Sequence, residues 1–396
     1  MQNKYLSYVN PIRKRSGKMK LRKCLAILLV VTLAGTLLAG CGGSKSKNES
    51  EQNSTESSSK STGTGKTEFT ASGDKIRFAM HPGNGAVAAY RAQKEGYFSD
   101  LGLDIEIVMF QNGVLINEGF AAGEVEIGIN GFASAYSFAT GEYAYLGDVN
   151  AQTEYGVYAS ADSDAAKVQG EVDGLPDVYG TKETVKGMQI LAPQGTIAQI
   201  VTDAYMAKLG VSSSDYELVG MDAGAALTAL LAGEGDAAGL FPPYSTQALN
   251  AGYVRLASYE EVCGCVPADV FMATNDFLET HYDDAVLICK SIYKAAEELE
   301  ADDDLYYNDA MEFFSENGKE YSDSDMRALI ASSYFYDEAH LTDQEYEFGY
   351  HETYATQNLI ALGLLTDDAL EKVKESTNKQ VLKDAIGIDI KTGFYE

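Results

Sequence analysis

One phrase of the sequence occurs twice, and this repeat restricts the possible folds more than any other feature of the chain. The two copies are AAGEVEIGINGFASAY at residues 121–136 and LAGEGDAAGLFPPYS at residues 231–245. At a shift of 110 residues, Gly123 meets Gly233, and the acids Glu126 and Asp236 coincide. Each copy predicts a helix that ends at the Gly, then a short strand, then a loop. The repeat therefore indicates two lobes of similar architecture.

Strand and helix patterns alternate on both sides of the repeated phrase. The first half predicts strands at 75–80, 103–109, 126–130 and 143–149, with helices at 86–98, 113–123 and 132–141. The second half predicts strands at 188–193, 216–221 and 236–241, with helices at 196–210, 223–233 and 242–252. After Asp276, helices are predicted at 284–300, 323–335, 343–362 and 367–384. The alternation predicts parallel sheets with crossover helices, and the later helices have apolar faces that suit packing on the first lobe.

The N-terminal residues predict export and attachment to a membrane. Residues 1–40 hold eight Lys or Arg and no acid, and they end in an apolar run that is slightly short for a stable membrane span. The run closes with Leu-Ala-Gly-Cys, which resembles the bacterial lipobox and makes Cys41 the expected lipidation site. The alternative is a free Cys at the end of a transmembrane helix. Met1 and Met19 are both candidate start residues.

Composition separates a tether from the globular part and excludes one class of partner. Residues 41–73 are rich in Ser, Thr, Gly and charge, which predicts a flexible tether after the signal peptide of residues 1–40. We assign residues 74–160 and 266–396 to the first lobe with its C-terminal helices, and 161–265, which begins with an acidic loop, to the second. The net charge of −29 argues against nucleic acid, because phosphate backbones are bound through Lys and Arg.

The usual signatures of metal and catalytic sites are missing from the sequence. No Cys/His spacing fits a zinc site, and no G-x-S-x-G elbow is present. Glu347 and His351 are four apart on an expected helix, where two ligands are too few for a metal and a solvated face is expected. A disulfide from Cys263 or Cys265 to Cys289 is possible and would leave one thiol over. We therefore predict a protein with no catalytic residue, metal or cofactor.

Five loops follow predicted strands, at the end of the sheet where open parallel sheets bind ligands. They are residues 81–85, 111–114, 130–134, 193–196 and 241–244. All five are expected to face one cleft if the lobes oppose each other. The candidate ligand-binding residues in these loops are His81, Asn84, Gln111, Asn112, Asn130, Gly131, Phe132, Ser134, Gln194, Gly195, Thr196, Phe241, Pro242 and Tyr244.

Several of these residues allow two interpretations. Gly195 and Thr196 precede a helix, whose free N–H groups could seat an anion, although Thr196 could instead be only an N-cap. His81 could contact a ligand or lie in a solvated loop. Phe132 and Phe241 occupy matching places after matching strands, where they could sandwich a flat or apolar ligand or belong to the core.

Four segments, in order, resemble the ABC-transporter substrate-binding proteins of the sulfonate, nitrate, taurine and thiamine-pyrimidine-precursor group. They are AYRAQKEGYFSDLGLDIEIV, AAGEVEIGINGFASA, VKGMQILAPQGT and AGEGDAAGLFPPYSTQA, and the resemblance covers roughly residues 75–300. Glu126 stands where that family usually has Asp. The resemblance implies an α/β architecture of type 2 periplasmic-binding-protein fold: two α/β lobes with a hinge, followed here by a helical C-terminal tail.

The same resemblance implies a function and partners. We expect an extracytoplasmic, lipid-anchored monomer that captures a small organic anion or heteroaromatic compound and delivers it to an ABC permease and its ATPase. One alternative is a pyrimidine-synthase-like enzyme on the same fold, which would need a cytoplasmic chain and a cofactor-binding Lys. The predicted signal peptide argues against that enzyme. A second alternative is a sensory or adhesive lipoprotein with no transport role.

Overall fold

The computed structural model describes residues 68–344 and 346–391 of the chain. The predicted signal peptide, both candidate start residues, Cys41 and most of the predicted tether lie outside the described residues. Within the described part, none of the helices combines the length and the apolar character needed to span a bilayer.

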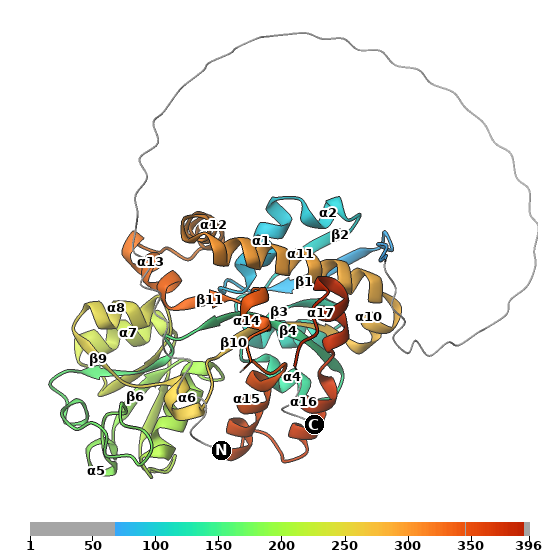
Figure 1. Cartoon of the computed structure of the whole chain (residues 1–396). Helices are drawn as coiled ribbons and strands as arrows, with labels where there is room; N and C mark the ends of the chain where they lie inside the picture. The colour runs from blue at the N-terminus through green and yellow to red at the C-terminus, as the bar shows by residue number, and fades with distance from the viewer. Residues whose placement is uncertain (1–67, 345, 392–396) are drawn as a thin grey trace, which may run out of the picture. The chain divides into compact units, whose positions relative to one another are not determined.

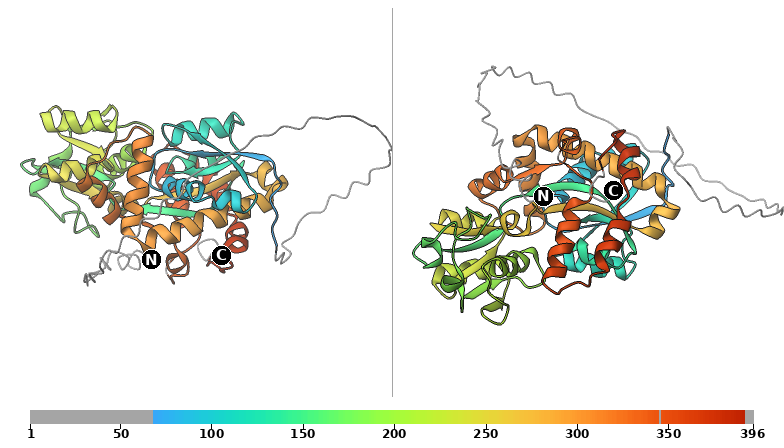
Figure 2. Two further views of the ribbon diagram at one scale, coloured as in Figure 1. Left: turned by 90° about the horizontal axis from the view of Figure 1, so that it is seen from above. Right: turned by 60° about the horizontal axis from the view of Figure 1, so that its bottom comes forward.

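The described chain contains two β-sheets (Figure 1). The first has the strand order β11 (Ser333–Phe335), β4 (Tyr143–Gln152), β10 (Ala268–Thr274), β3 (Ile127–Asn130), β1 (Lys75–Met80), β2 (Asp104–Met109). The second has the order β7 (Glu217–Gly220), β6 (Gln189–Ala192), β8 (Ala237–Leu240), β5 (Gly156–Ser160), β9 (Tyr253–Ser258). We call each sheet with its helices a lobe. In Figure 2 the green and yellow elements of the second lobe gather on one side of the first.

The two lobes repeat one topology. The order β2-β1-β3-β10-β4 in the first sheet corresponds to β7-β6-β8-β5-β9 in the second. In both, three parallel strands are followed by one antiparallel strand, β10 or β5. These antiparallel strands are the ones that enter from the other lobe, since β5 follows β4 and β10 follows β9. The predicted repeat is confirmed, and so are the parallel strands, while the sequence patterns did not predict the antiparallel strand in each sheet.

The repeated phrase performs the same structural task in each lobe. Gly123 and Gly233 follow helices α3 (Gly113–Ala121) and α7 (Ala223–Ala232) with φ of 69° and 77°, a left-handed conformation that favours Gly. The carboxylate of Glu126 accepts the backbone N–H of Arg77 at 3.0 Å. The carboxylate of Asp236 accepts that of Gln189 at 2.8 Å. Each acid thus fastens the start of one strand to its parallel neighbour.

Helices cover both sheets. Those of the first lobe are α1 (Ala86–Lys94), α2 (Tyr97–Asp100), α3, α4 (Ser134–Phe138), α10 (Asn275–Thr280), α11 (Tyr282–Ala301), α12 (Asp303–Glu316), α13 (Asp323–Ala331), α14 (Glu338–Leu341), α16 (Ala369–Ser376) and α17 (Lys379–Ile386). Those of the second are α5 (Lys182–Val185), α6 (Ile197–Lys208), α7, α8 (Tyr244–Asn250) and α9 (Tyr259–Cys263), with a short 3-10 turn at Ala165–Lys167. As predicted, α11 and α17 pack against the first lobe, where they bury one continuous apolar core.

One C-terminal helix, α15 (Tyr350–Ala361), contacts both lobes. Its Ala355 and Leu359 belong to the buried core of the second lobe. Asn358 donates a hydrogen bond from its amide to the carbonyl of Cys263 in α9, at 3.0 Å. On the first lobe, Glu352 accepts a hydrogen bond from Ser134. The helix therefore fastens the two lobes together.

Several predicted elements were wrong or missing. Strands β5, β9 and β10 and helix α12 were not predicted. The helix predicted at 323–335 ends at Ala331, because residues 333–335 pair with β4 as a strand. The helix predicted at 343–362 begins only at Tyr350. The helix predicted at 367–384 is interrupted at Asn378, whose N–H donates to the carbonyl of Tyr145.

The cysteine and His351 predictions need correction. Cys263, Cys265 and Cys289 are free and buried, with Cys289 in the first core and the other two in the second, so no disulfide to Cys289 forms. His351 is not on a solvated face. It is 3% exposed, and its Nδ1 lies 2.9 Å from the carboxylate of Asp148 on β4. Glu347 precedes the helix and pairs with Lys391.

The predicted lobe boundaries at 160/161 and 265/266 stay predictions. Strand β5 at 156–160 pairs in the second sheet, although the prediction assigned these residues to the first lobe.

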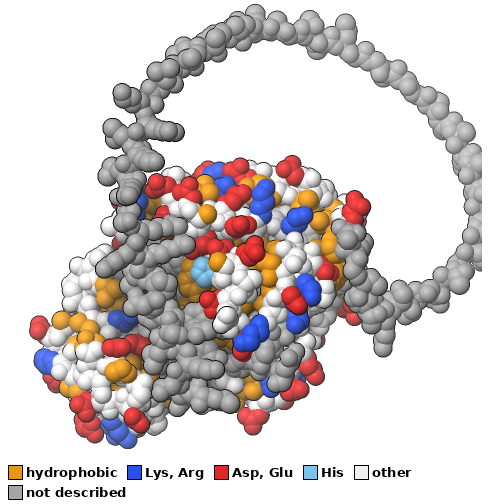
Figure 3. All heavy atoms as spheres, in the orientation of Figure 1, with side chains coloured by type: hydrophobic (Ala, Val, Ile, Leu, Met, Phe, Trp, Pro, Cys, Tyr) orange, Lys and Arg blue, Asp and Glu red, His pale blue; other side chains and the backbone are white. Residues whose placement is uncertain are grey.

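In Figure 3 acidic side chains are scattered over the visible face, with Lys and Arg interspersed among them. The described part of this face therefore offers a polyanion no continuous basic surface.

Candidate functional site

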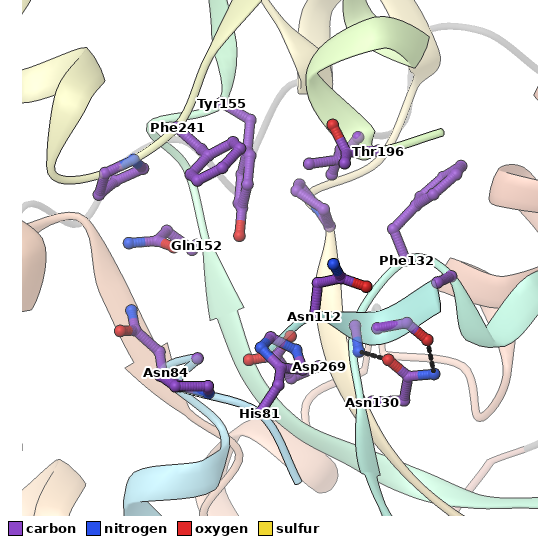
Figure 4. Close-up of a pocket in the computed structure, with 18 of the residues that line it drawn as sticks. His81, Asn84, Asn112, Asn130, Phe132, Gln152, Tyr155, Thr196, Phe241 and Asp269 are labelled. Carbon is purple, nitrogen blue, oxygen red and sulfur yellow. Dashed lines mark hydrogen bonds between the residues drawn. The ribbon is translucent and has the colours of Figure 1, made fainter. Parts of the chain in front are cut away.

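A cavity of about 190 Å³ lies between the two lobes (Figure 4). All five loops that were predicted to face one cleft contribute to its walls. The predicted residues that line it are His81, Asn84, Gln111, Asn112, Asn130, Gly131, Phe132, Gly195, Thr196, Phe241 and Pro242. The loops meet because each follows a strand at the same edge of its sheet. That these residues bind a ligand remains a prediction.

Three predicted residues do not line the cavity. Ser134 is buried at the start of α4, where its hydroxyl lies 2.8 Å from both the carbonyl of Gly131 and the carboxyl group of Glu352. Gln194 lies against the backbone of Gly220 in β7, so closely that a Cβ there would clash with its amide. Tyr244 packs behind Phe241, with the ring centres 6.2 Å apart.

Two of the lining residues support the shape of the loops. The amide of Asn130 donates to the carbonyl of Gly113 and to Asn117, and it accepts from the N–H of Gly131. Two of these bonds are the dashed lines in Figure 4. Thr196 is the N-cap of α6: its hydroxyl donates to the carbonyl of Pro193 and accepts from the N–H of Ala198. The N-cap interpretation of Thr196 is therefore confirmed, and its hydroxyl is already engaged.

Aromatic rings form opposite walls of the cavity. Phe132 comes from the first lobe and lies edge-on to Tyr259, with ring centres 6.0 Å apart. Phe241 comes from the second lobe and lies beside Tyr155 in the β4–β5 crossing, with ring centres 6.3 Å apart. Figure 4 shows Phe132 on one side of the space and Phe241 with Tyr155 on the other. These walls suit a ligand with an apolar or flat part.

Besides Tyr155 and Tyr321, three titratable side chains line the cavity, and burial shifts the pKa of each. Burial lowers the pKa of His81 to about 3, and the neighbouring Lys319 lowers it further, so the imidazole is neutral at pH 7. Burial raises the pKa of Asp269 to about 6, against the opposing effects of the Gly85 N–H and Lys319. Burial lowers the pKa of Lys319 to about 8, against the attraction of Asp269 and Asp222.

Two buried amides in the cavity wall have donors without a partner among the described residues. They are Nδ2 of Asn84, at the start of α1, and Nε2 of Gln152, at the end of β4. The two side chains are 6% and 7% exposed. A buried N–H group without a hydrogen bond costs about 1–3 kcal/mol. The two residues that carry these donors both line the cavity.

The sequence prediction missed the polar residues that come from unpredicted segments. Asn150, Gln152 and Tyr155 lie beyond the predicted end of the strand at 143–149, and Asp269 lies on β10. The short apolar run VFMA between Asp269 and Thr274 could have identified β10 as a buried strand. Lys319 follows α12 and lies more than 200 residues after His81 in the sequence. No local sequence signal places it at the same cavity. We find no cluster of metal-ligating residues in the part of the chain that the structure covers.

Comparisons with known proteins agree with this geometry. Residues 72–307, more than half of the chain, match the model of the NMT1-like family. A protein of Brachyspira hyodysenteriae named as an ABC transporter periplasmic binding protein is 30% identical over 219 residues. That alignment covers 55% of this chain and 63% of the relative, so it spans less than two thirds of the relative's length.

Two solved structures share the fold at low sequence identity. The alkanesulfonate-binding protein of Xanthomonas axonopodis pv. citri, bound to MOPS, superimposes with a TM-score of 0.57 at 16% identity, over 77% of this chain and 98% of that one. The periplasmic nitrate-binding protein of Synechocystis superimposes with a TM-score of 0.60 at 13% identity, over 80% of this chain and 89% of that one.

Proposed function

This chain belongs to the NMT1-like family and has the type 2 periplasmic-binding-protein fold expected from its sequence, and on that premise we propose that it is the extracytoplasmic solute-binding component of an ABC importer. The observation that carries the proposal is the cavity between the lobes, which holds two unsatisfied buried donors and takes its walls from both lobes. The chain binds its ligand and does not transform it.

The mechanism follows from ligand contacts on both sides of the cavity. A molecule that touches Asn84 of the first lobe and the start of α6 in the second interacts with more groups when the lobes are closed than when they are open. It therefore stabilises the closed state by its differential affinity for the two states. The closed protein then presents a surface that the permease recognises.

The ligand belongs to the small organic anions or heteroaromatic compounds, such as a sulfonate, taurine, nitrate or a thiamine-pyrimidine precursor. Lys319 and the two amide donors supply hydrogen bonds to an anionic group, and the aromatic walls accommodate an apolar or flat part. The names of the relatives support this choice of class: one solved neighbour is an alkanesulfonate-binding protein and another a nitrate-binding protein.

Thermal unfolding of the exported form, which begins at Cys41, tests the proposal. A panel of sulfonates, nitrate, taurine, pyrimidines and aromatic acids is expected to contain at least one compound that raises the melting temperature in a concentration-dependent way. The same compound should lose its effect in the variant Asn84→Leu and keep it in Lys290→Gln, a change at an exposed lysine of α11. If no member of the panel shifts the melting temperature, the proposal is wrong.

We further propose that Cys41 carries the lipid anchor and that the partners are a permease and its ATPase. The lipobox-like sequence and the name of the Brachyspira relative support this assignment. Expression of the full chain with Cys41→Ala is expected to move the protein from the membrane fraction to the soluble fraction. A sensory lipoprotein would bind its ligand equally well, but it would not stimulate the ATPase of a reconstituted importer.

A further inference from the structure

The side chains that line the cavity include one acid and one base, Asp269 and Lys319. Neither forms an ion pair with any residue that the structure describes, so the two charges face the cavity without direct neutralisation. An isolated charge in a closed, partly apolar cavity loses its hydration and becomes costly unless a counter-charge replaces the water. A ligand that fills the cavity must therefore supply a counter-charge to each of the two side chains.

Asp269 is held rigidly at the wall of the cavity. One carboxylate oxygen accepts the N–H of Gly85 at 2.8 Å. A Cβ at Gly85 would lie 2.6 Å from the Cβ of Asp269, and a Cβ at Gly131 would lie 2.9 Å from its other carboxylate oxygen, Oδ1. The two glycines therefore create the space that the carboxylate occupies. Oδ1 is left with no hydrogen bond to a described residue.

Lys319 is fixed on the same lobe by different contacts. Its ammonium group donates a hydrogen bond to the carbonyl of Pro82 and lies 5.9 Å from the centre of the Phe314 ring. Two of its three N–H groups remain for a ligand. Asn84 and Gln152 also line the cavity, and the amide nitrogen of each is buried without a hydrogen-bond partner among the described residues. The cavity lining thus combines the Lys319 ammonium group with one carboxylate, that of Asp269.

Resting on the proposed function, we propose that the ligand is a small zwitterion, with an acidic group for Lys319, Asn84 and Gln152 and an ammonium group for Asp269. A simple anion such as nitrate or an alkanesulfonate would satisfy the donors but leave the Asp269 carboxylate unpaired beside a like charge. A simple cation would leave Lys319 unpaired. A zwitterion neutralises both, and its short skeleton can lie between the aromatic walls.

The test compares molecules that differ only in which charges they carry. Three matched sets are used: taurine, ethanesulfonate and ethylamine; β-alanine, propionate and ethylamine; phenylalanine, 3-phenylpropionate and phenethylamine. Calorimetric titration of the exported form at pH 7 is expected to show that the zwitterion of at least one set binds about tenfold or more tightly than its matched anion and amine.

Two variants assign the charges to residues. Asp269→Asn, which keeps the size of the side chain, is expected to weaken binding of the zwitterion about tenfold or more. Binding of the matched anion should be unchanged or tighter. Lys319→Gln is expected to weaken binding of both the zwitterion and the anion. Lys290→Gln, at an exposed lysine outside the cavity, should change neither. Melting curves of each variant show whether it is folded before binding is compared.

The outcomes separate this inference from the proposed function. One outcome is that a simple anion from these sets, or a compound of the broader panel that lacks an ammonium group, binds as tightly as every zwitterion. In that case the proposal of a zwitterionic ligand is wrong and the solute-binding role stands. The comparison on the unmodified chain decides this even if a variant fails to fold. If no compound of either collection binds, both proposals fall.

Discussion

The hydroxyl of Ser134 lies 2.8 Å from Oε1 of Glu352, a residue 218 positions further along the chain. The contact joins the loop that carries Phe132 to the helix that fastens the two lobes together. Both residues are buried, at 0% and 3% exposure, and Oε2 of Glu352 has no partner among the described residues. Burial raises the pKa of Glu352 to about 8, so the carboxyl is mainly protonated at neutral pH.

Replacement of Glu352 by Gln should make the protein more stable at alkaline pH. The raised pKa means that the folded state holds the proton more tightly than the unfolded state, so the stabilisation is present below pH 4.5 and is lost as pH rises through about 8. Glu352→Gln keeps the acceptor for Ser134 and has no charge to bury. Its free energy of unfolding in urea should exceed that of the parent by about 1–3 kcal/mol at pH 8 and match it near pH 4.5. Glu118→Gln, an exposed change on α3, serves as the control and should show no such difference.

Replacement of His81 by Gln should protect the protein against acid. The pKa of His81 falls to about 3 in the folded state, so the folded protein resists protonation of the ring. Its contribution to stability is present above pH 6.5 and is lost as pH falls towards 3. His81→Gln should lower the midpoint of acid unfolding, whereas His281→Gln, at a partly exposed histidine, should not. An unchanged midpoint for His81→Gln would show that the ring is not buried in its neutral form.

The two glycines of the repeated phrase should respond equally to substitution. Neither Gly123 nor Gly233 has an atom within 4 Å of the place where a Cβ would be added, so only the backbone conformation opposes a side chain. Gly123→Ala and Gly233→Ala should each lower the free energy of unfolding by about 1–2 kcal/mol. Asn tolerates the left-handed region better, so Gly233→Asn should cost less than Gly233→Ala. Equal effects of Ala and Asn in chemical denaturation would contradict this explanation.

The same change at two asparagines of the cavity should affect different properties, ligand affinity at Asn84 and folding stability at Asn130. Asn84→Leu removes a donor that has no partner, so the free energy of unfolding should stay within about 1 kcal/mol of the parent while ligand affinity falls about tenfold. Asn130→Leu removes three hydrogen bonds that shape the loops and should lower the free energy of unfolding by about 2 kcal/mol or more. Urea unfolding combined with ligand titration measures both quantities. A stable Asn130→Leu variant would assign that side chain to the ligand instead.

Ligand affinity should pass through a maximum near pH 7. A zwitterion requires Asp269 ionised and Lys319 protonated, and their pKa values in the free protein are about 6 and about 8. Affinity should fall below pH 6, as the carboxyl takes up a proton, and above pH 8, as the ammonium loses one. His81 titrates near pH 3 and does not contribute. In Asp269→Asn, titrations between pH 5 and 9 should no longer show the decrease in affinity below pH 6 but should still show the decrease above pH 8.

The sequence was sufficient to predict the elements that local patterns define. Strand β1 and the ends of α3 and α7 at Gly123 and Gly233 follow from apolar alternation and from the special backbone freedom of Gly. The loops after the parallel strands could be placed on the cavity for the same reason, because their position depends only on strand direction. Ser134 does not line the cavity, because the first turn of α4 directs its side chain towards α15, and no local pattern records that contact.

The crossing strands and the charged groups of the cavity depend on contacts between distant segments. Strand β10 lies between β3 and β4 in the sheet, but it follows β9 of the other lobe in the chain. Lys319 reaches the cavity only because α12 packs on α1. The positions of such residues depend on contacts between distant segments, so the local sequence patterns did not identify either charged side chain of the cavity.

The position of β10 also sets an order for synthesis. The second sheet has all five of its strands once Ser258 has been made, whereas the first sheet lacks its connecting strand until Thr274 follows. Until then β4 has no neighbour in its sheet, because both of its partners, β10 and β11, come later in the chain. The lobe that begins the chain is therefore the last to be completed, and a ribosome or export channel that releases the chain from its N-terminus presents β4 as an unpaired edge during that interval.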